Sequence, residues 1–382
     1  MRALIVFDKF KDAIGAPEAG AIAARAIAAK QPAWQLDPCP LTDGGEGFCA
    51  ILTRAAGGET ESVTVTGPRG APVRASLGLV ALEKIPPAAR TLLAPGPGER
   101  VAVIEMASAS GLALLAPGDR DPWQATTLGT GELIRAAAAR GVAAILVGVG
   151  GSATNDLGLG ALAALGLECQ DAHGRPILPP VPARWGDVAR LAGTAAVPPP
   201  IRIACDVTNP LLGPRGAAAI YGPQKGLREA DLARLEHAAD RLARMLLAHC
   251  GQPLSLLEVP GAGAAGGISF GLMAAAGARL LPGFDLVTAW LGLEARLAAA
   301  DLVVTGEGRF DDSSLTGKRP GAIAARALAL GKRVHVFAGA VTTTAPAPAG
   351  LTLHAITPPG TPLPEALRAT AQNLATAVQR TF

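Results

Sequence analysis

The alternation of short apolar runs with alanine-rich, helix-forming segments constrains the fold of this chain more than any other feature. Residues 3–7 form an apolar run that predicts a buried strand, and residues 17–30 predict a helix with proline in its first turn. Further strands are predicted at residues 36–39, 61–66, 72–79, 101–104, 144–149, 201–205, 301–305, 333–338 and 351–356, and further helices at 48–56, 132–140, 230–250 and 363–378. Such alternation is typical of α/β units around a largely parallel sheet, so we expect an α/β fold.

Two stretches rich in glycine and proline are the best candidates for domain boundaries. They lie at residues 67–70, in the turn of a predicted hairpin, and at residues 282–283. At about 150 residues per domain, a chain of 382 residues is expected to hold two or three domains. We predict one domain from residues 1–66 together with 285–382, and a second, inserted domain from residues 67–284.

Composition and charge exclude several classes of protein. Apolar residues make up 49% of the chain and charged residues 17%, which excludes disorder caused by low hydrophobicity. A formal net charge of +3 gives little support for binding to nucleic acid or acidic membranes, and no apolar run reaches the ~20 residues of a membrane helix. Five scattered cysteines without a C-x-x-C pair favour neither a disulfide framework nor a zinc site. We expect a cytoplasmic protein with no membrane or nucleic-acid partner.

Polar or glycine-rich loops follow six of the predicted strands. They span residues 8–11, 42–47, 105–108, 150–156, 206–209 and 306–309. Ligands of open α/β sheets bind beyond the carboxyl ends of the strands, where these loops would converge. Each loop alone is equally well explained as a turn whose side chain caps the next helix, but six together favour a binding site. Within residues 150–152, backbone N–H groups before a helix could bind a phosphate.

Lysine and carboxylate side chains in these loops suit phosphoryl transfer. Only seven of the 34 basic residues are lysines, and Lys225 and Lys318 both stand beside glycines. A compact ammonium there would suit phosphate or carboxylate, although an exposed turn explains each lysine equally well. Carboxylates available for Mg²⁺ or for general-base catalysis are Asp43, Asp206, Asp285, Glu307 and Asp311.

Two functions other than phosphoryl transfer are also compatible with the sequence. Residues 148–153 match G-x-G-x-x-A after a strand, with Asp171 at the spacing of a ribose contact, which would suit an NAD-dependent dehydrogenase of a small hydroxy acid. A non-catalytic protein that binds organic acids is the other alternative. Residues 261–266 (G-x-G-x-x-G) directly follow a proline, and residues 267–271 (G-x-S-x-G) follow no clear strand, so Ser269 is better explained as part of a helix start.

Taken together, these loops resemble the type-1 glycerate kinase family. The matching motifs are DKFK (8–11), TDGGEG (42–47), EMASASGL (105–112), LGTGELI (128–134), GVGGSATND (148–156), CDVTNPLL (205–212), YGPQKG (221–226), PGAGAAGG (260–267) and VTGEGRFDDSSLTGK (304–318). They occur in the family's order and cover nearly the whole chain. The chain departs from the family at Lys9, Asp12 and Ala13, where Ser, Gly and Ser are usual, and at Phe48, where Thr is usual. These departures leave the substrate preference open.

The resemblance implies ATP-dependent phosphorylation of D-glycerate with the assistance of Mg²⁺. The 2-hydroxyl is the expected acceptor, giving 2-phosphoglycerate, although the sequence does not distinguish this product from 3-phosphoglycerate. The resemblance also implies two α/β domains with the active site in the cleft between them. One of them would be a discontinuous, Rossmann-like parallel sheet built from both chain ends. Whether the protein is a monomer or a homodimer stays open.

The expected site residues fall into four groups. The catalytic group is Asp43, Asp206 and Lys225, with Asp43 or Asp206 as the base that accepts the hydroxyl proton. The substrate-binding group is Asp8, Lys11, Gly150, Gly151, Ser152 and Asn155. The nucleotide-binding group is Glu307, Asp311, Lys318, Gly266 and Gly267, and the expected metal ligands are Asp206 and Asp285.

Overall fold

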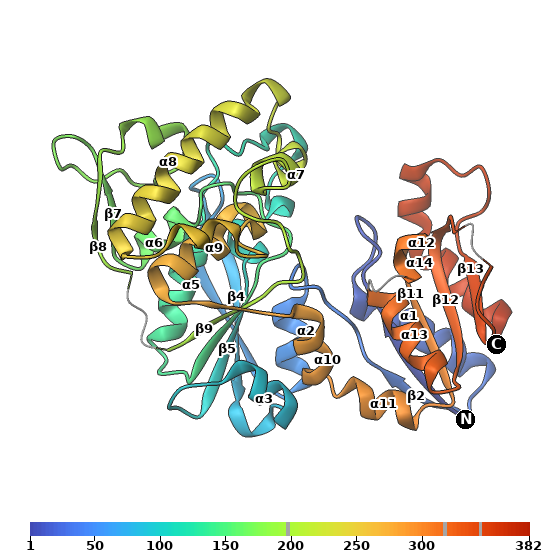
Figure 1. Cartoon of the computed structure of the whole chain (residues 1–382). Coiled ribbons are helices and arrows are strands. Elements are labelled where there is room, and N and C mark those ends of the chain that lie inside the picture. The colour runs from blue at the N-terminus through green and yellow to red at the C-terminus, as the bar shows by residue number, and fades with distance from the viewer. Residues whose placement is uncertain (196–198, 316–318, 344–345) are drawn as a thin grey trace. The chain divides into compact units, whose positions relative to one another are not determined.

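The chain divides into two compact units. The computed structural model describes residues 1–195, 199–315, 319–343 and 346–382. Unit 1 comprises Met1–Thr42 and Val287–Phe382, and unit 2 comprises Asp43–Leu286. In Figure 1, unit 1 therefore takes the colours of both chain ends, blue and orange to red, and unit 2 takes the colours between them.

Unit 1 contains a five-stranded sheet in which all neighbouring strands are parallel. Its strands are β1 (Arg2–Phe7), β2 (Gln35–Pro38), β11 (Leu302–Phe310), β12 (Arg333–Val341) and β13 (Leu351–Ala355). They lie in the order β2-β1-β11-β12-β13. From β1 the chain moves to β2 on one side, and after the insertion of unit 2 it continues through β11 on the other side.

Helices cover the sheet of unit 1. They are α1 (Ala16–Lys30), α11 (Leu293–Ala299), α12 (Asp312–Leu315), α13 (Arg319–Ala329) and α14 (Leu363–Thr381), with α10 (Gly283–Trp290) at the boundary of the two units. Helices α1 and α14 pack against each other, and α13 packs against β11 and β12. Alternate residues of β1, among them Ile5 and Phe7, share a buried cluster with Ile27 of α1 and Leu374 of α14. These two helices therefore cover the same face of the sheet.

Unit 2 contains a six-stranded sheet of mixed direction. Its strands, in the order β10-β9-β6-β5-β4-β3, are β10 (Arg279–Leu281), β9 (Ile201–Ala204), β6 (Ala144–Gly148), β5 (Arg100–Glu105), β4 (Pro72–Ala81) and β3 (Glu59–Thr66). The first four are parallel, whereas β3 and β4 form the antiparallel hairpin that the sequence predicts. Two short strands, β7 (Leu167–Gln170) and β8 (Arg190–Gly193), form a separate antiparallel pair.

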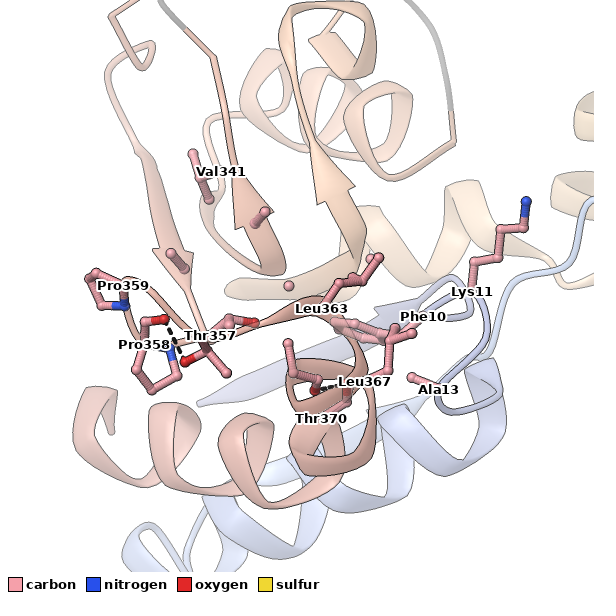
Figure 2. A pocket seen from close by; sticks show the side chains of 16 residues that line it. Phe10, Lys11, Ala13, Val341, Thr357, Pro358, Pro359, Leu363, Leu367 and Thr370 are labelled. Atoms are coloured by element: carbon pink, nitrogen blue, oxygen red, sulfur yellow. Dashed lines mark hydrogen bonds between the residues drawn. The ribbon is translucent and has the colours of Figure 1, made fainter.

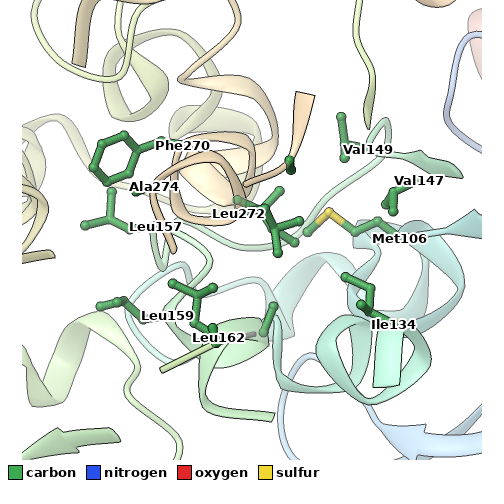
Figure 3. Close-up of a cluster of buried hydrophobic side chains, with 14 of the residues drawn as sticks. Met106, Ile134, Val147, Val149, Leu157, Leu159, Leu162, Phe270, Leu272 and Ala274 are labelled. Carbon is green, nitrogen blue, oxygen red and sulfur yellow. The ribbon is translucent and has the colours of Figure 1, made fainter. Parts of the chain in front are cut away.

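The helices of unit 2 bury a large apolar core against this sheet. They are α2 (Phe48–Ala55), α3 (Pro87–Leu93), α4 (Ala107–Ser110), α5 (Leu128–Ala138), α6 (Leu159–Ala164), α7 (Ala217–Tyr221), α8 (Leu232–Cys250) and α9 (Ala264–Ala276). Figure 3 shows part of the core, where Val149 and Leu157 pack with Met106, Leu162 and Leu272. Because Val149 and Leu157 stand at either end of the glycine-rich loop 150–156, the core anchors that loop on both sides.

The fold confirms the predicted α/β class with mostly parallel sheets, but the units divide the chain elsewhere than the predicted break at residue 66. All eight residues of β3 pair with β4, so residues 43–66 belong with unit 2. The predicted break near residues 282–285 lies close to the division after Leu286. Among the described residues, no helix is both long and apolar enough to cross a bilayer.

Candidate functional site

The four parallel strands of unit 2 end in one row. Glu105 of β5 pairs with Gly148 of β6, which pairs with Ala204 of β9, and Ala204 pairs with Leu281 of β10. The loops that follow these residues therefore start at the same edge of the sheet. Predicted site residues Gly150, Asn155, Asp206 and Asp285 all lie in or just after these loops.

The loop that carries Asp43 packs directly on the glycine-rich loop after β6. The backbone N–H of Gly150 donates to the carbonyl oxygen of Gly44 at 2.9 Å. A Cβ atom on Gly150 would lie 2.7 Å from Gly45, so the two backbones meet without space for a side chain. Asp43 accepts a hydrogen bond from the N–H of Gly45 at 2.9 Å, which fixes the turn. The structure thus brings together Asp43, Gly150 and Gly151, as the sequence predicts.

Phe48, one of the departures from the family pattern, packs beside the contact between the Asp43 loop and the glycine-rich loop. Its side chain is fully buried, and a Cβ atom on Gly148 would lie 2.6 Å from its ring. Phe48 therefore packs against the end of β6, directly before the glycine-rich loop. In unit 1, Asp12 takes the position where glycine is usual and has a left-handed φ of 61°, which Asp tolerates better than most residues.

The buried half of the loop is held by Asp156. This carboxylate is fully buried and accepts hydrogen bonds from the N–H and hydroxyl of Thr127 at 2.7 and 2.8 Å, and from the N–H groups of Gly158 and Gly160. Burial raises the pKa of Asp156, whereas these hydrogen bonds act in the opposite direction. The carboxylate thus fixes the start of α5 and α6 against the loop.

Lys225 also binds the glycine-rich loop, through hydrogen bonds to Thr154 and Asn155. It is 1% exposed, and its Nζ donates to the carbonyl oxygen of Thr154 at 2.6 Å and to Oδ1 of Asn155 at 3.2 Å. Burial lowers the pKa of Lys225 to about 7, although the negative charge of Asp156 opposes this shift. Lys225 is therefore not the exposed turn residue of the alternative explanation, and it orders Thr154 and Asn155.

Gly266 and Gly267 contact this loop as well. Ala265, Gly266 and Gly267 all have left-handed φ values, 53°, 74° and 90°, which interrupt the start of α9. A Cβ atom on Gly266 would lie 1.9 Å from the carbonyl oxygen of Thr154. Only glycine allows this approach, so Gly266, predicted to bind nucleotide, lies beside Asn155, predicted to bind substrate, and Gly267 lies beside Leu157 at the end of the loop.

Three buried polar atoms in this region have no hydrogen-bond partner in the part of the chain that the structure describes. They are Oγ1 of Thr154, Nδ2 of Asn155 and Oγ of Ser269, which lies in α9 as the sequence predicts. Buried polar groups are nearly always paired, so unpaired donors suggest a polar ligand or water. Thr154 and Ser269 are not among the predicted site residues, although Thr154 lies in the GVGGSATND motif and Ser269 in the G-x-S-x-G pattern.

Asp206 and Asp285 follow the ends of β9 and β10. Asp206 is exposed and accepts a hydrogen bond from the N–H of Phe284 at 2.9 Å, at the start of α10. Asp285 is also exposed. Among the described residues, no group of three or more His, Cys, Asp or Glu side chains is arranged to hold a metal ion. Mg²⁺ in kinases is commonly bound by one or two carboxylates together with substrate phosphates, so these residues fit Mg²⁺ carried by a nucleotide.

The remaining predicted residues belong to unit 1. Asp8 is 8% exposed directly after β1, and its N–H donates to Gly306 of β11 at 3.1 Å. Lys11 is exposed, Glu307 is half-buried within β11, and Asp311 follows that strand. Asp8 and Lys11, predicted to bind substrate, thus share the carboxyl edge of β1 and β11 with Glu307 and Asp311, predicted to bind nucleotide. Lys318 lies outside the described residues.

Comparisons with known proteins agree with the resemblance found in the sequence. Residues 3–382 match the model of the Glycerate kinase family. Glycerate 2-kinase of Escherichia coli K12 is 38% identical over 351 residues, which cover 90% of this chain and 86% of that protein. Glycerate kinase of Bacillus subtilis 168 is 38% identical over 348 residues, covering 89% and 85%. The crystal structure of a candidate glycerate kinase 2 from Salmonella typhimurium LT2 is similar with a TM-score of 0.74 and 35% identity, covering 100% of this chain and 97% of that one.

Proposed function

Because this chain belongs to the glycerate kinase family, we propose that it transfers the γ-phosphoryl group of ATP to the 2-hydroxyl of D-glycerate. The products would be ADP and 2-phosphoglycerate. Membership of this family makes the protein a kinase, and the resemblance stated from the sequence is confirmed. The predicted cleft active site, cytoplasmic location, absence of a nucleic-acid partner and monomeric or homodimeric state stay predictions.

One observation carries the assignment of the glycerate site: buried donors without partners stand beside a lysine at the carboxyl edge of unit 2. Thr154 and Asn155 are ordered by Lys225, and each retains a buried polar atom that no described residue pairs with. A small hydroxy acid offers a carboxylate and hydroxyls that can pair with such groups. We place the carboxylate of glycerate at Ser152–Asn155, with Lys225 as a positioning residue.

A carboxylate near this loop would accept the proton of the attacking hydroxyl. Asp43 and Asp206 both fit, because Asp43 packs beside the glycine loop and Asp206 follows the adjacent strand β9. Charge that develops on the transferred phosphoryl group requires cations, and Mg²⁺ bound with ATP would supply the largest share. If Asp43 is the base, Asp206 and Asp285 would hold that ion together with the phosphates; if Asp206 is the base, Asp285 would hold it.

The dehydrogenase alternative is not supported. The second glycine of a dinucleotide-binding motif lets the pyrophosphate approach the backbone, and here that residue is Gly150. Its Cβ position is already occupied by Gly45, 2.7 Å away. Asp171, the predicted ribose contact, instead accepts hydrogen bonds from Arg175 and from the N–H of His173.

A coupled assay tests the proposed reaction. The purified protein is mixed with Mg²⁺, ATP and D-glycerate, and the release of ADP is followed with pyruvate kinase and lactate dehydrogenase. We expect ADP release that depends on D-glycerate. Addition of enolase in a parallel assay should yield phosphoenolpyruvate, since enolase acts on 2-phosphoglycerate. Glycerate binding without ADP release would instead support the non-catalytic alternative.

A further inference from the structure

Unit 1 contains a pocket of about 420 Å³ that is lined by residues of unit 1 alone. Its volume is within the range of about 300–1,000 Å³ that small-molecule sites occupy. Figure 2 shows its lining, which includes Phe10, Lys11, Val341, Thr357, Leu363 and Leu367. No residue of this pocket except Lys11 was assigned a role from the sequence.

The pocket stands where the topology of unit 1 predicts a ligand. Ligands of doubly wound sheets bind outside the carboxyl ends of the strands, at the point where the strand order reverses. In unit 1 this point lies between β1 and β11, whose ends pair at Phe7 and Gly306. Phe10 and Lys11, which follow β1, and Gly308 of β11 all line the pocket. The cavity therefore reaches the switch point of the sheet on one side and extends past the ends of β12 and β13, where Val341 and Thr357 line it.

The walls of the pocket are mainly apolar, and the side chain of one wall residue, Leu363, is exposed to solvent. Leu363, in the first turn of α14, is 70% exposed, the largest value among the exposed large apolar side chains of the described residues. Phe10 is nearly buried, and Leu367 lies one helical turn after Leu363. A flat apolar ligand would cover Leu363 and contact Phe10 and Leu367. Glycerate, a three-carbon acid with three polar groups, offers no such surface.

Two threonine hydroxyls of the lining can accept hydrogen bonds from a ligand. The hydroxyl of Thr370 donates to the carbonyl oxygen of Ala366 at 2.9 Å, and the hydroxyl of Thr361 donates to that of Pro358 at 2.8 Å (Figure 2). Since each hydroxyl hydrogen is already used, the oxygen of each threonine is left as an acceptor. A base with an exocyclic amino group matches these acceptors.

We propose that this pocket binds the adenosine part of ATP, which deepens the proposed kinase function and rests on it. The adenine ring would lie between Phe10, Leu363 and Leu367, with its amino group toward the threonine oxygens. Figure 2 shows the Lys11 side chain extending away from the apolar walls. Its exposed ammonium suits the phosphates of the nucleotide, so Lys11 belongs with the nucleotide and not with glycerate.

Replacement of the exposed leucine tests the proposal. Leu363→Ala removes apolar surface that water already reaches, so the variant should fold like the wild type. We expect its dissociation constant for ADP, measured by calorimetry, to rise roughly tenfold. The affinity for tripolyphosphate and the KM for D-glycerate should not change. Leu330→Ala is the matched control, because Leu330 is 48% exposed in the same unit and does not line the pocket.

A photolabel locates the base directly. Irradiation of the full chain with 8-azido-ATP should modify peptides that contain residues 357–370, and excess ATP should prevent it. Equal ADP affinity of Leu363→Ala and wild type, or labelling confined to residues 43–286, would overturn the proposal. If the wild type binds ADP in a Leu363-dependent manner but does not phosphorylate glycerate, the proposed function fails and the nucleotide pocket stands. If glycerate is phosphorylated but Leu363 has no effect on ADP, the pocket proposal alone fails.

Discussion

Both units have a row of parallel strands that end at one edge of the sheet, but the two edges differ in chemistry. In unit 2 the loops meet backbone to backbone, and the space between them holds buried polar groups such as Lys225, Asp156 and Thr154. In unit 1 the corresponding edge carries the charged residues Asp8, Lys11 and Glu307, and it also has a mainly apolar pocket at which Leu363 is exposed. A parallel sheet thus determines where a ligand binds, whereas the side chains of the loops determine which ligand binds there.

The largest expected effect concerns catalysis at the polar edge. Asp206→Asn should lower kcat by about 10²–10⁴-fold, the contribution of a general acid or base. The unfolding midpoint should not change, because the side chain is exposed and an Asn oxygen can still accept the hydrogen bond from Phe284. Steady-state kinetics and urea unfolding measure the two quantities. Asp240→Asn is the control, because Asp240 of α8 is partly exposed, pairs with Arg244 and was assigned no role at the site. Near-normal turnover of Asp206→Asn would leave Asp43 as the base.

The backbone packing of unit 2 predicts an effect on stability. Gly266→Ala should lower the free energy of unfolding by about 2–5 kcal/mol, because the new Cβ meets the carbonyl oxygen of Thr154 and the φ of 74° is left-handed. Gly277→Ala is a matched control with a similar φ of 62° and nothing within 4 Å of its Cβ. It should cost only about 1–2 kcal/mol. Equal losses in urea unfolding would contradict the close packing at Gly266.

Because of Lys225, the free energy of unfolding of unit 2 should depend on pH above pH 7. Its pKa is about 7 when folded and about 10.4 in an unfolded chain, so the unfolded state binds more protons between these values. The free energy of unfolding should therefore rise by roughly 1.4 kcal/mol per pH unit above pH 7. Urea unfolding at pH 7, 8 and 9 measures this rise. Lys225→Met should abolish it, and Lys84→Met, which changes an exposed lysine of unit 2, should not. A slope retained in Lys225→Met would show that another group is responsible.

The stability of unit 1 should instead decrease in acid, and this is the smallest of the four predicted effects. His335 and His354 are stacked and half-buried, and burial lowers the pKa of both, that of His335 to about 4. Because the unfolded histidines bind protons near pH 6.5, stability should be lost as the pH falls from 6.5 toward 4. Unfolding midpoints at pH 7, 6 and 5 measure this loss. It should be smaller in His335→Phe and unchanged in His173→Phe, where an exposed histidine is replaced. An identical loss in His335→Phe would exclude this pair as its source.

The sequence predicts local structure well because periodicity is a local property. The predicted strand at residues 3–7 is confirmed as β1, the helix at 48–56 as α2 (Phe48–Ala55), and the helix at 230–250 as α8 (Leu232–Cys250). The sequence predicted a break at residue 66, whereas β3, which ends at Thr66, pairs with β4 in the sheet of unit 2. An alternating strand such as β3 has the same pattern in whichever sheet it pairs, so its partner cannot be read from the pattern.

The candidate site could be predicted in part. Strand-end position selected Gly150, Asn155 and Asp206, which lie at one edge of the unit 2 sheet because its parallel strands end together, and it selected Asp43 as a residue that follows β2. The burial of Lys225 could not be predicted, because a Gly-Pro-Gln-Lys-Gly turn looks exposed until the loop that covers it is known. The apolar pocket of unit 1 was missed for a similar reason. Phe10, Val341 and Leu363 are far apart in sequence, and each alone resembles an ordinary core or surface residue.

The insertion of unit 2 between β2 and β11 has a consequence for the order in which the protein folds during synthesis. β1 pairs with β11, so residues 2–7 must wait until about 300 further residues have left the ribosome before their main partner exists. Unit 2 is continuous in sequence and can fold first, since its strands all lie within residues 59–281. The apolar strand β1 is meanwhile exposed on the nascent chain, so slow translation after residue 286 should increase its capture by chaperones.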